Sequence, residues 1–205
     1  MPSTAKSATQ RPTLSLRERN RRRTRREILD AALEVFAESG YGSATVENIA
    51  ARAGTAKATL YSYFPQGREE LLRQLYEEIN NELIEKVTLV YASNGTVFDR
   101  VVATTEVVLD IAQRPLVGRF YSIDDPALDA ALTVVRGHAS CGFADLLTAD
   151  LGAAQDVGAI RSTAQPAAIA GLLLGAMRSA LTQVACEAAQ PRDVVQAMKA
   201  LISTL

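Results

Sequence analysis

The chain has 205 residues, of which 48% are hydrophobic and 22% charged, with 22 Lys and Arg against 23 Asp and Glu. This apolar fraction can build a core, which excludes a wholly disordered chain. One His and two Cys supply too few groups for a zinc site, a disulfide framework or most His-dependent catalysis, so we expect a soluble cytoplasmic protein that has no metal or cofactor and is not an enzyme.

The charge is divided unevenly along the chain. Residues 1–73 carry a net charge of +5 and residues 74–205 a net charge of −6. Residues 1–26 alone hold nine basic residues and one acid, Glu18. A basic N-terminal part on an acidic body indicates that the N-terminal part meets a polyanion and the body does not.

The first third of the chain predicts a flexible arm over residues 1–24 and then three short helices. The basic run over residues 17–26 fits either the start of a helix or its disordered approach. From Arg25, apolar residues recur at helical spacing until Ser39-Gly40. A second helix is expected over residues 46–53 after the N-cap Thr45, and a third over residues 56–63 after the N-cap Thr55. The head of the molecule is therefore predicted over residues 25–67.

Residues 68–205 predict six further helices and no strand, so the fold class is all-α with nine helices. A long helix starts near Arg68 and runs for about 22 residues, which at 3.6 residues per turn keeps one apolar stripe. The next elements are expected at residues 96–113, 116–121, 124–146, 166–188 and 191–203, with a Gly- and Ala-rich loop over residues 151–163. The apolar run at residues 166–177 is shorter than the roughly 18 residues that a membrane span needs, so we expect no membrane partner.

The second and third helices, joined at Ala53-Gly54-Thr55, have the spacing of a helix-turn-helix. The run at residues 28–41 is similar to the first helix of the tetracycline-repressor-like (TetR) family of transcription regulators, and residues 45–54 are similar to its second helix and turn. Residues 59–64 resemble the end of its recognition helix, and residues 69–72 the start of its linking helix. The resemblance covers about residues 25–75 in motif detail, and the remainder only through helix number and order. It implies a homodimeric repressor with a C-terminal ligand-binding and dimerisation domain over residues 68–205.

The resemblance assigns DNA contacts to the head. Lys57 is the candidate base reader, directed at guanine O6 and N7, and Ala58 either touches a thymine methyl or permits close approach. Hydroxyls stand where the family contacts phosphates, at Thr45, Thr59, Tyr61 and Tyr63. Tyr61 is the strongest of these, whereas Tyr63 fits the core equally well. The basic run, represented by Arg21, Arg22 and Arg23, is expected on phosphates rather than on a solvated face.

Two departures from the family pattern surround the recognition helix. The connection at Pro65-Gln66-Gly67-Arg68 is one residue longer than usual, and Arg68 is the candidate to replace a Lys that contacts phosphate in the family. At the start of the third helix, Thr55-Ala56 stands where the family often has an apolar residue and then Ser.

The body is expected to hold a ligand pocket and a dimer interface. The family builds its pocket among the fourth to eighth helices, where Phe120, Tyr121 and Phe143 are candidate apolar walls and Arg114, His138 and Arg178 candidate polar anchors. The last two helices are the family's dimer-forming pair, with intramolecular core as the alternative role. The candidate interface residues are Gly171, Leu174, Gly175, Met177, Leu181, Val195, Met198 and Ile202.

The sequence is compatible with two functions. The first is a repressor that a small molecule releases from double-stranded operator DNA, with a second copy of the chain as a further partner. In that hypothesis the helix from Arg68 carries the signal and Pro65-Gln66-Gly67 is the pivot. The alternative is a constitutive dimeric DNA-binding protein whose C-terminal domain only dimerises.

Overall fold

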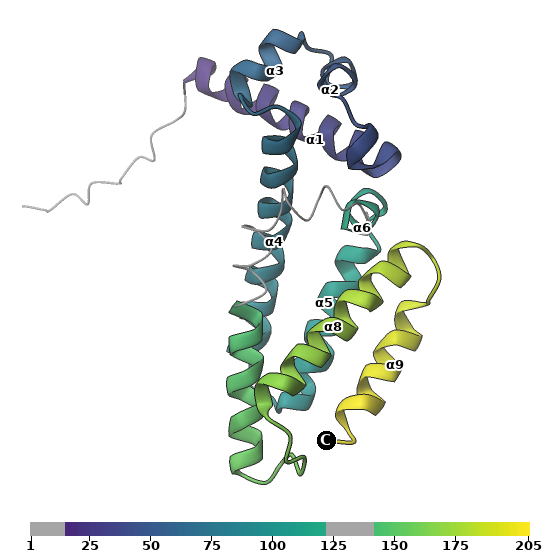
Figure 1. The fold of residues 1–205 in the computed structure, drawn as a ribbon. Coiled ribbons are helices and arrows are strands. Elements are labelled where there is room, and N and C mark those ends of the chain that lie inside the picture. The colour runs from purple at the N-terminus through teal and green to yellow at the C-terminus, as the bar shows by residue number, and fades with distance from the viewer. Residues whose placement is uncertain (1–14, 122–141) are drawn as a thin grey trace, which may run out of the picture.

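The computed structural model describes residues 15–121 and 142–205. These residues form helices and loops only, which confirms the all-α prediction (Figure 1). The labelled helices are α1 (Leu16–Ser43), α2 (Val46–Arg52), α3 (Lys57–Tyr63), α4 (Arg68–Ala92), α5 (Val97–Ala112), α6 (Pro115–Tyr121), α8 (Pro166–Ala185) and α9 (Pro191–Ile202). A ninth helix in the described part of the chain covers residues 142–156. Helices α1–α3 form a head at one end, and α4 runs from this head into a body made of the other helices.

Helix α1 begins earlier than the sequence pattern indicates. Ser15 caps it, because its Oγ accepts from the Glu18 N–H at 3.2 Å and the Ser15 N–H donates to Glu18 Oε2 at 2.9 Å. This reciprocal capping box fixes the first turn. Residues 16–24, which we assigned to a flexible arm, are therefore helical, and the arginine run lies on an ordered helix.

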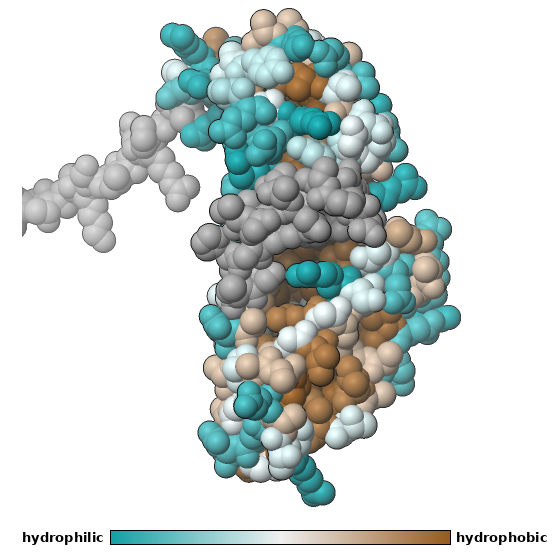
Figure 2. All heavy atoms as spheres, viewed as in Figure 1, coloured by the Kyte–Doolittle hydropathy of each residue, from teal (hydrophilic) through white to brown (hydrophobic). Residues whose placement is uncertain are grey.

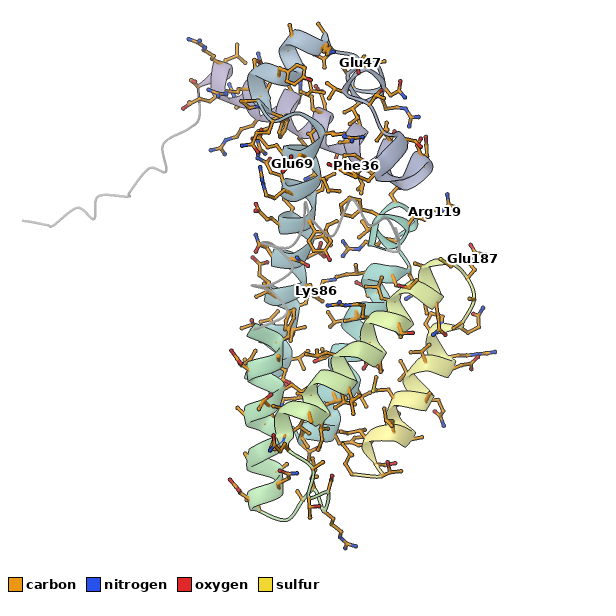
Figure 3. The ribbon with its side chains drawn as sticks, viewed as in Figure 1. Phe36, Glu47, Glu69, Lys86, Arg119 and Glu187 are labelled. Atoms are coloured by element: carbon orange, nitrogen blue, oxygen red, sulfur yellow. The ribbon has the colours of Figure 1, made fainter. Side chains whose placement is uncertain are left out.

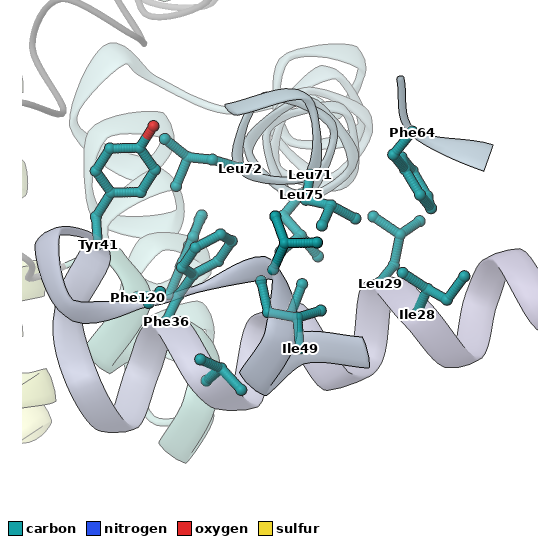
Figure 4. Packing of buried hydrophobic residues seen from close by; sticks show 14 of the residues in the cluster. Ile28, Leu29, Phe36, Tyr41, Ile49, Phe64, Leu71, Leu72, Leu75 and Phe120 are labelled. Carbon is teal, nitrogen blue, oxygen red and sulfur yellow. The ribbon is translucent and has the colours of Figure 1, made fainter. Parts of the chain in front are cut away.

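The head has one continuous core (Figure 4). Ile28, Leu29 and Phe36 of α1 are almost completely buried against the short helices and the first turns of α4. Phe120 of α6 enters the same core, with its ring centroid 6.2 Å from those of both Phe36 and Tyr76. Aromatic rings in tilted contact at this distance attract one another. Helix α6 thus joins the head directly to the body.

The body is built around α5, which packs against α4, α6, α8 and α9. Its apolar residues form two separate clusters, one with the helix over residues 142–156 and one with the C-terminal half of α8. Arg100 of α5 donates to Asp150 from Nε at 2.7 Å, which ties that helix to α5. The expectation of a loop from residue 151 is wrong at its start, because Leu151 and Ala154 are buried and residues 151–156 remain helical. Most of the helix predicted over residues 124–146 lies outside the described residues.

Helix α8 ends at Ala185, slightly before the expected end at residue 188, but its apolar stretch is longer than the run at residues 166–177. Within the described residues it is the one helix whose length and composition would allow it to cross a membrane. Its buried residues, among them Ala170, Leu173 and Met177, pack with α5 and α9 in the same cluster. These contacts bury one face of α8, and 39% of its apolar stretch is buried inside the protomer.

Candidate nucleic-acid interface

Helices α2 and α3 are held by a tight turn. Thr45 is the N-cap of α2, as expected, and its Oγ1 accepts from the Asn48 N–H at 3.2 Å. Gly54 turns the chain with a φ of 63°, which favours glycine, and the Thr55 N–H closes the turn on the Ala50 carbonyl at 2.9 Å. The expected cap at Thr55 is wrong: α3 begins at Lys57 after Ala56, which offers no side-chain cap.

The outer surface of α3 carries most of the predicted contact residues. Lys57, Ala58 and Tyr61 are exposed, with Tyr61 40% accessible, whereas Thr59 and Tyr63 are half-buried. Leu60 and Phe64 are fully buried and fix the helix on the head core. The helix therefore presents its first turn and one hydroxyl-bearing face outward, which is the arrangement that a recognition helix needs in the major groove.

Lys57 has an acidic partner that the sequence analysis did not assign. Its Nζ forms an ion pair with Oε1 of Glu47, in the first turn of α2, and lies 5.9 Å from the centre of the Tyr61 ring. The hydrogen bond to Glu47 raises the pKa of Lys57, and the same bond lowers the pKa of Glu47. Glu47 lies at the end of the head that faces away from the body (Figure 3).

The basic run forms an exposed row on the N-terminal half of α1. Within residues 15–121 and 142–205, Arg17, Arg19, Arg21 and Arg22 form no ion pair. Arg23 pairs with Glu27 at 3.4 Å on the helix surface, an exposed arrangement that contributes little stability. The row therefore offers uncompensated positive charge for phosphates.

A groove of about 800 Å³ separates this row from α3. Its lining residues are Leu16, Arg17, Asn20, Arg21, Thr24, Ser62 and Tyr63. The Arg21 guanidinium carbon lies 6.0 Å from the centre of the Tyr63 ring, so the two helices meet at the floor of the groove. Tyr63 is partly buried against the head core and also lines this groove beside the arginines, so it combines both expected roles.

Three other arginines of the head bond to groups of the head and of α4. Arg68 donates through Nη1 to the carbonyls of Ala44 at 3.0 Å, Tyr41 at 3.2 Å and Gly42 at 3.3 Å, and its guanidinium carbon lies 4.7 Å from the Tyr41 ring centre. The expected phosphate contact by Arg68 is not supported, because this guanidinium holds the end of α1 and the start of α2. Arg25 bonds to Gln74, and Arg26 pairs with Glu78 at 2.8 Å. These contacts fasten α1 to α4.

The predicted pivot belongs to the rigid part of the head. Gly67 has a φ of 63°, and a Cβ there would lie 3.3 Å from both Tyr61 Cε1 and Val46 Cγ2. The Gln66 N–H also donates to Glu70 Oε2 at 3.0 Å. Because α4 is fixed to the head from its first residue, Pro65-Gln66-Gly67 is a poor place for a hinge.

The candidate ligand residues do not form one site. Phe143 lines a small cavity with Val87, Tyr91, Val101, Thr104, Leu147, Leu174 and Met177. Phe120 is 3% exposed and belongs to the head core, so its assignment to a pocket wall is wrong. Arg114 pairs with Glu82 across α4 and α5, and Arg178 is exposed on α8. The side chain of Tyr121 and the whole of His138 lie outside the described residues.

The small cavity lined by Phe143 also contains a buried polar group, the Thr104 hydroxyl. Its free volume is about 10 Å³, close to the space of one water molecule. The Thr104 hydroxyl is buried there without a hydrogen-bond partner among the described residues. Burial also raises the pKa of the neighbouring Tyr91 to about 12. An unpaired buried hydroxyl costs about 1–3 kcal/mol, so it marks a place that a ligand or water can occupy favourably.

The candidate dimer residues divide into two groups. Met177, Leu181, Met198 and Ile202 are between 3% and 8% exposed, so they form the protomer's own core and their assignment to the interface is wrong. Leu174 and Val195 are partly buried against the same clusters. Gly171 and Gly175 are exposed, and a Cβ on either would meet nothing within 4 Å.

Several residues of the interface were missed by sequence reasoning. Glu47 was not assigned to the interface. Asn20 and Thr24 join Arg17 and Arg21 at a spacing of three and four, which places all four on one face of a helix. The sequence contains this spacing, but it places the four residues on one face only if the helix already begins at Leu16. Thr104 gave no signal, because a single Thr is common in an apolar helix.

Comparison with known proteins matches the head most strongly. Residues 28–75 fit the family model described as bacterial regulatory proteins, tetR family. The fatty acid metabolism regulator protein of Bacillus subtilis is 43% identical over 61 residues, which are 30% of this chain and 31% of that protein. The transcriptional repressor LfrR of Mycolicibacterium smegmatis is 42% identical over 69 residues, 32% and 35% of the two chains. The chain thus spans about a third of the length of these curated relatives.

Solved structures extend the likeness in fold to the body. The transcriptional regulator FadR from Bacillus subtilis, solved in complex with stearoyl-CoA, superposes with a TM-score of 0.71 at 20% identity. The alignment covers 88% of this chain and 98% of that one. The described head and body therefore share the fold of that regulator.

Proposed function

Because residues 28–75 match the model of the tetR family of bacterial regulatory proteins, we propose that the chain is a DNA-binding regulator of that family. We further propose that it is a homodimeric repressor released from its operator by an apolar small molecule. The observation that carries the DNA-binding part is the row of unpaired arginines on α1 beside the outward face of α3. Positive charge along a groove binds phosphates, and a helix end beside it reads bases. A target in chromosomal DNA implies a cytoplasmic location.

A second copy of the chain is proposed to cover α8 and α9. Leu172 is 77% exposed and Leu201 48% exposed, and the small residues Gly171 and Gly175 lie beside Leu172 on α8. Figure 2 shows hydrophobic and neutral residues gathered over the part of the body where Figure 1 places these helices. Apolar surface of this kind is buried favourably between protomers, and glycines allow close approach of helix backbones. A two-fold dimer would present two α3 helices to two half-sites.

The cavity beside Thr104 supports an apolar effector. Apart from Thr104 and the Tyr91 hydroxyl, its walls are aliphatic side chains and one phenyl ring. The helix over residues 142–156 supplies two of these walls and is tied to α5 by the Arg100–Asp150 pair. An effector that enlarged this cavity would displace that helix relative to α4 and α5. Such a ligand changes DNA affinity only if it binds two arrangements of the body unequally.

Helix α6 is the proposed route from the body to the head. It packs on α1 and on α8, and Phe120 inserts between Phe36 of α1 and Tyr76 of α4. Gly118 approaches α5 so closely that a Cβ there would lie 2.2 Å from the Ala112 carbonyl oxygen. A shift of α5 is therefore passed to α6 and then to the head, whose tilt sets the spacing of the two α3 helices.

The experiment begins with duplexes selected by the full chain from a random pool, placed before a reporter gene. A repressor lowers reporter output, and the substitution of Arg17, Arg21 and Arg22 by Gln restores it. Stearoyl-CoA and free stearate are the first effector probes, because a FadR of the same fold was solved with stearoyl-CoA. Higher output in the presence of the chain would contradict repression. Operator affinity that no apolar probe changes would favour the constitutive dimer.

A further inference from the structure

Glu47 occupies an unfavourable place for an acid if the head binds DNA. It stands in the first turn of α2, its side chain is 60% exposed, and it lies on the outward end of the head beside the proposed base reader. In free protein its charge is balanced by Lys57. Once Lys57 donates to a base, this carboxylate is left beside two rows of phosphates without its counterion.

A carboxylate in the major groove is favourable only where it accepts a hydrogen bond. The donors that base edges present there are the amino groups of cytosine N4 and adenine N6. Guanine offers acceptors, O6 and N7, which suit the ammonium of Lys57. In one G·C base pair, the guanine O6 lies next to the cytosine N4, so an acceptor and a donor stand side by side across the pair.

The Glu47–Lys57 pair has the complementary arrangement. One oxygen of Glu47 is in hydrogen-bond contact with Lys57 Nζ, so a donor and an acceptor lie side by side on the protein. Thr45 fixes the start of α2 through its cap, and Tyr61 lies under the ammonium of Lys57. The two charged groups are therefore presented together from two helices whose relative position is set by the turn at Gly54.

We propose that Glu47 and Lys57 read a single G·C base pair together, with Lys57 donating to guanine and Glu47 accepting from the cytosine N4 amino group of the same pair. This inference rests on the proposed role of α3 as the recognition helix. An A·T pair in that place presents the adenine N6 amino group where guanine presents O6, and the thymine O4 carbonyl where cytosine presents N4. Glu47 then loses its donor, and Lys57 keeps only the adenine N7 as an acceptor. Glu47 thereby determines specificity rather than affinity.

The test uses the full chain and a duplex that it selects from a random pool. Affinities are measured for all single base-pair replacements in one half-site, with wild type, Glu47→Ala, Glu47→Gln, Lys57→Ala and the double variant. Each single variant is expected to reduce the preference for G·C over A·T, and all of them should do so at the same base pair. The reduction should be about fivefold or more, because fivefold corresponds to the smallest discrimination expected of a good base contact. The double variant should lose less than the product of the two single losses, because the contacts are coupled.

Glu38→Ala is the matched control. Glu38 is an exposed acid of the head whose partner, Arg52, lies at the opposite end of α2, at 2.8 Å. Its removal changes the net charge as Glu47→Ala does, so it should alter affinity for all duplexes by one factor. Glu47→Gln keeps the side-chain size, which separates the loss of charge from a disturbance of α2.

The outcomes are distinct. A Glu47→Ala profile that shifts uniformly, like that of Glu38→Ala, would overturn the inference and leave Glu47 as a counterion. The inference would also be overturned if Glu47→Ala lost its base preference at a base pair other than the one affected by Lys57→Ala. If wild type itself binds all duplexes alike, the proposed function fails and not only this inference.

Discussion

The head and the body of this molecule are stabilised in different ways. The head has one core, and its arginines Arg25, Arg26 and Arg68 fasten α1 and the start of α2 to α4. The body divides its core into two clusters and leaves a buried hydroxyl and a small void between helices. Close packing with satisfied polar groups resists rearrangement, whereas voids and unpaired groups permit it. In the proposed function, the head that reads DNA is thus built to keep its shape and the body that binds the effector is built to change it.

The largest expected effect comes from separating the two regions at Phe120. Phe120→Ala removes a buried ring shared by head and body and should destabilise the protein by about 3–5 kcal/mol, as large aromatic truncations do. Denaturant unfolding measures the loss. Phe120→Leu, which keeps most of the volume, is the control. If both variants unfold like wild type, α6 does not join the two regions.

Arg68→Ala tests the rigidity of the head. Its charged hydrogen bonds to three carbonyls suggest a loss of about 1.5–3 kcal/mol in stability. The salt dependence of DNA affinity should stay as in wild type, because Arg68 contacts no phosphate in this account. A shallower salt dependence with unchanged stability would restore Arg68 to the DNA surface.

Thr104→Val tests the adaptable character of the body. Valine has the shape of threonine without its hydroxyl, so the free protein should gain stability, by at most about 1–3 kcal/mol. The melting temperature of the free protein should rise. The further rise caused by a largely apolar effector that bonds to the Thr104 hydroxyl should become smaller. Thr105→Val is the matched control, because the Thr105 hydroxyl is satisfied by the Val101 carbonyl at 2.8 Å and its loss should destabilise.

The pair between Glu82 and Arg114 gives the smallest effect. The hydrogen bond from Arg114 lowers the pKa of Glu82 to about 2. A depressed pKa stabilises the fold above the unfolded pKa of about 4.5 and loses that contribution as the pH falls toward 2. Because both side chains are more than a third exposed, the contribution should stay within about 1 kcal/mol. The measurement is the free energy of unfolding of wild type and Glu82→Gln between pH 6 and pH 3, and the difference between the two proteins should shrink as the pH falls. A difference that grows toward pH 3 would contradict a stabilising role of the Glu82 carboxylate.

The sequence predicted best where local chemistry decides the structure. Thr45 caps its helix as expected, the helix expected over residues 96–113 is present as α5, and the start of α4 at Arg68 was located correctly. The start of α1 was missed because its capping box lies in a polar run without apolar spacing. Residues 151–156 were taken for a loop because Gly and Ala are weak signals, and their helix is stabilised by burial against distant residues.

The roles predicted for candidate site residues were wrong where the residue's partner is distant in sequence. Arg68 bonds to backbone carbonyls, which no side-chain pattern reveals. Phe120 and Met198 were recognised as apolar, but apolar spacing does not say whether the covering surface is a ligand, a second copy or the chain's own core. The same reason hid the pairing of Glu47 with Lys57, because it depends on how two helices meet.

In the proposed function, two copies of the chain bind one operator through their two heads. Sedimentation of the full chain with a selected duplex tests it most directly, with Leu172→Glu as the variant and Leu89→Glu, at a similarly exposed leucine of α4, as its control. We expect an even number of protomers on the whole site and greatly weakened binding to a duplex that carries only one half-site. Leu172→Glu should bind both duplexes weakly, and Leu89→Glu should behave as wild type. A single protomer bound equally well to the half-site and the whole site would contradict the account.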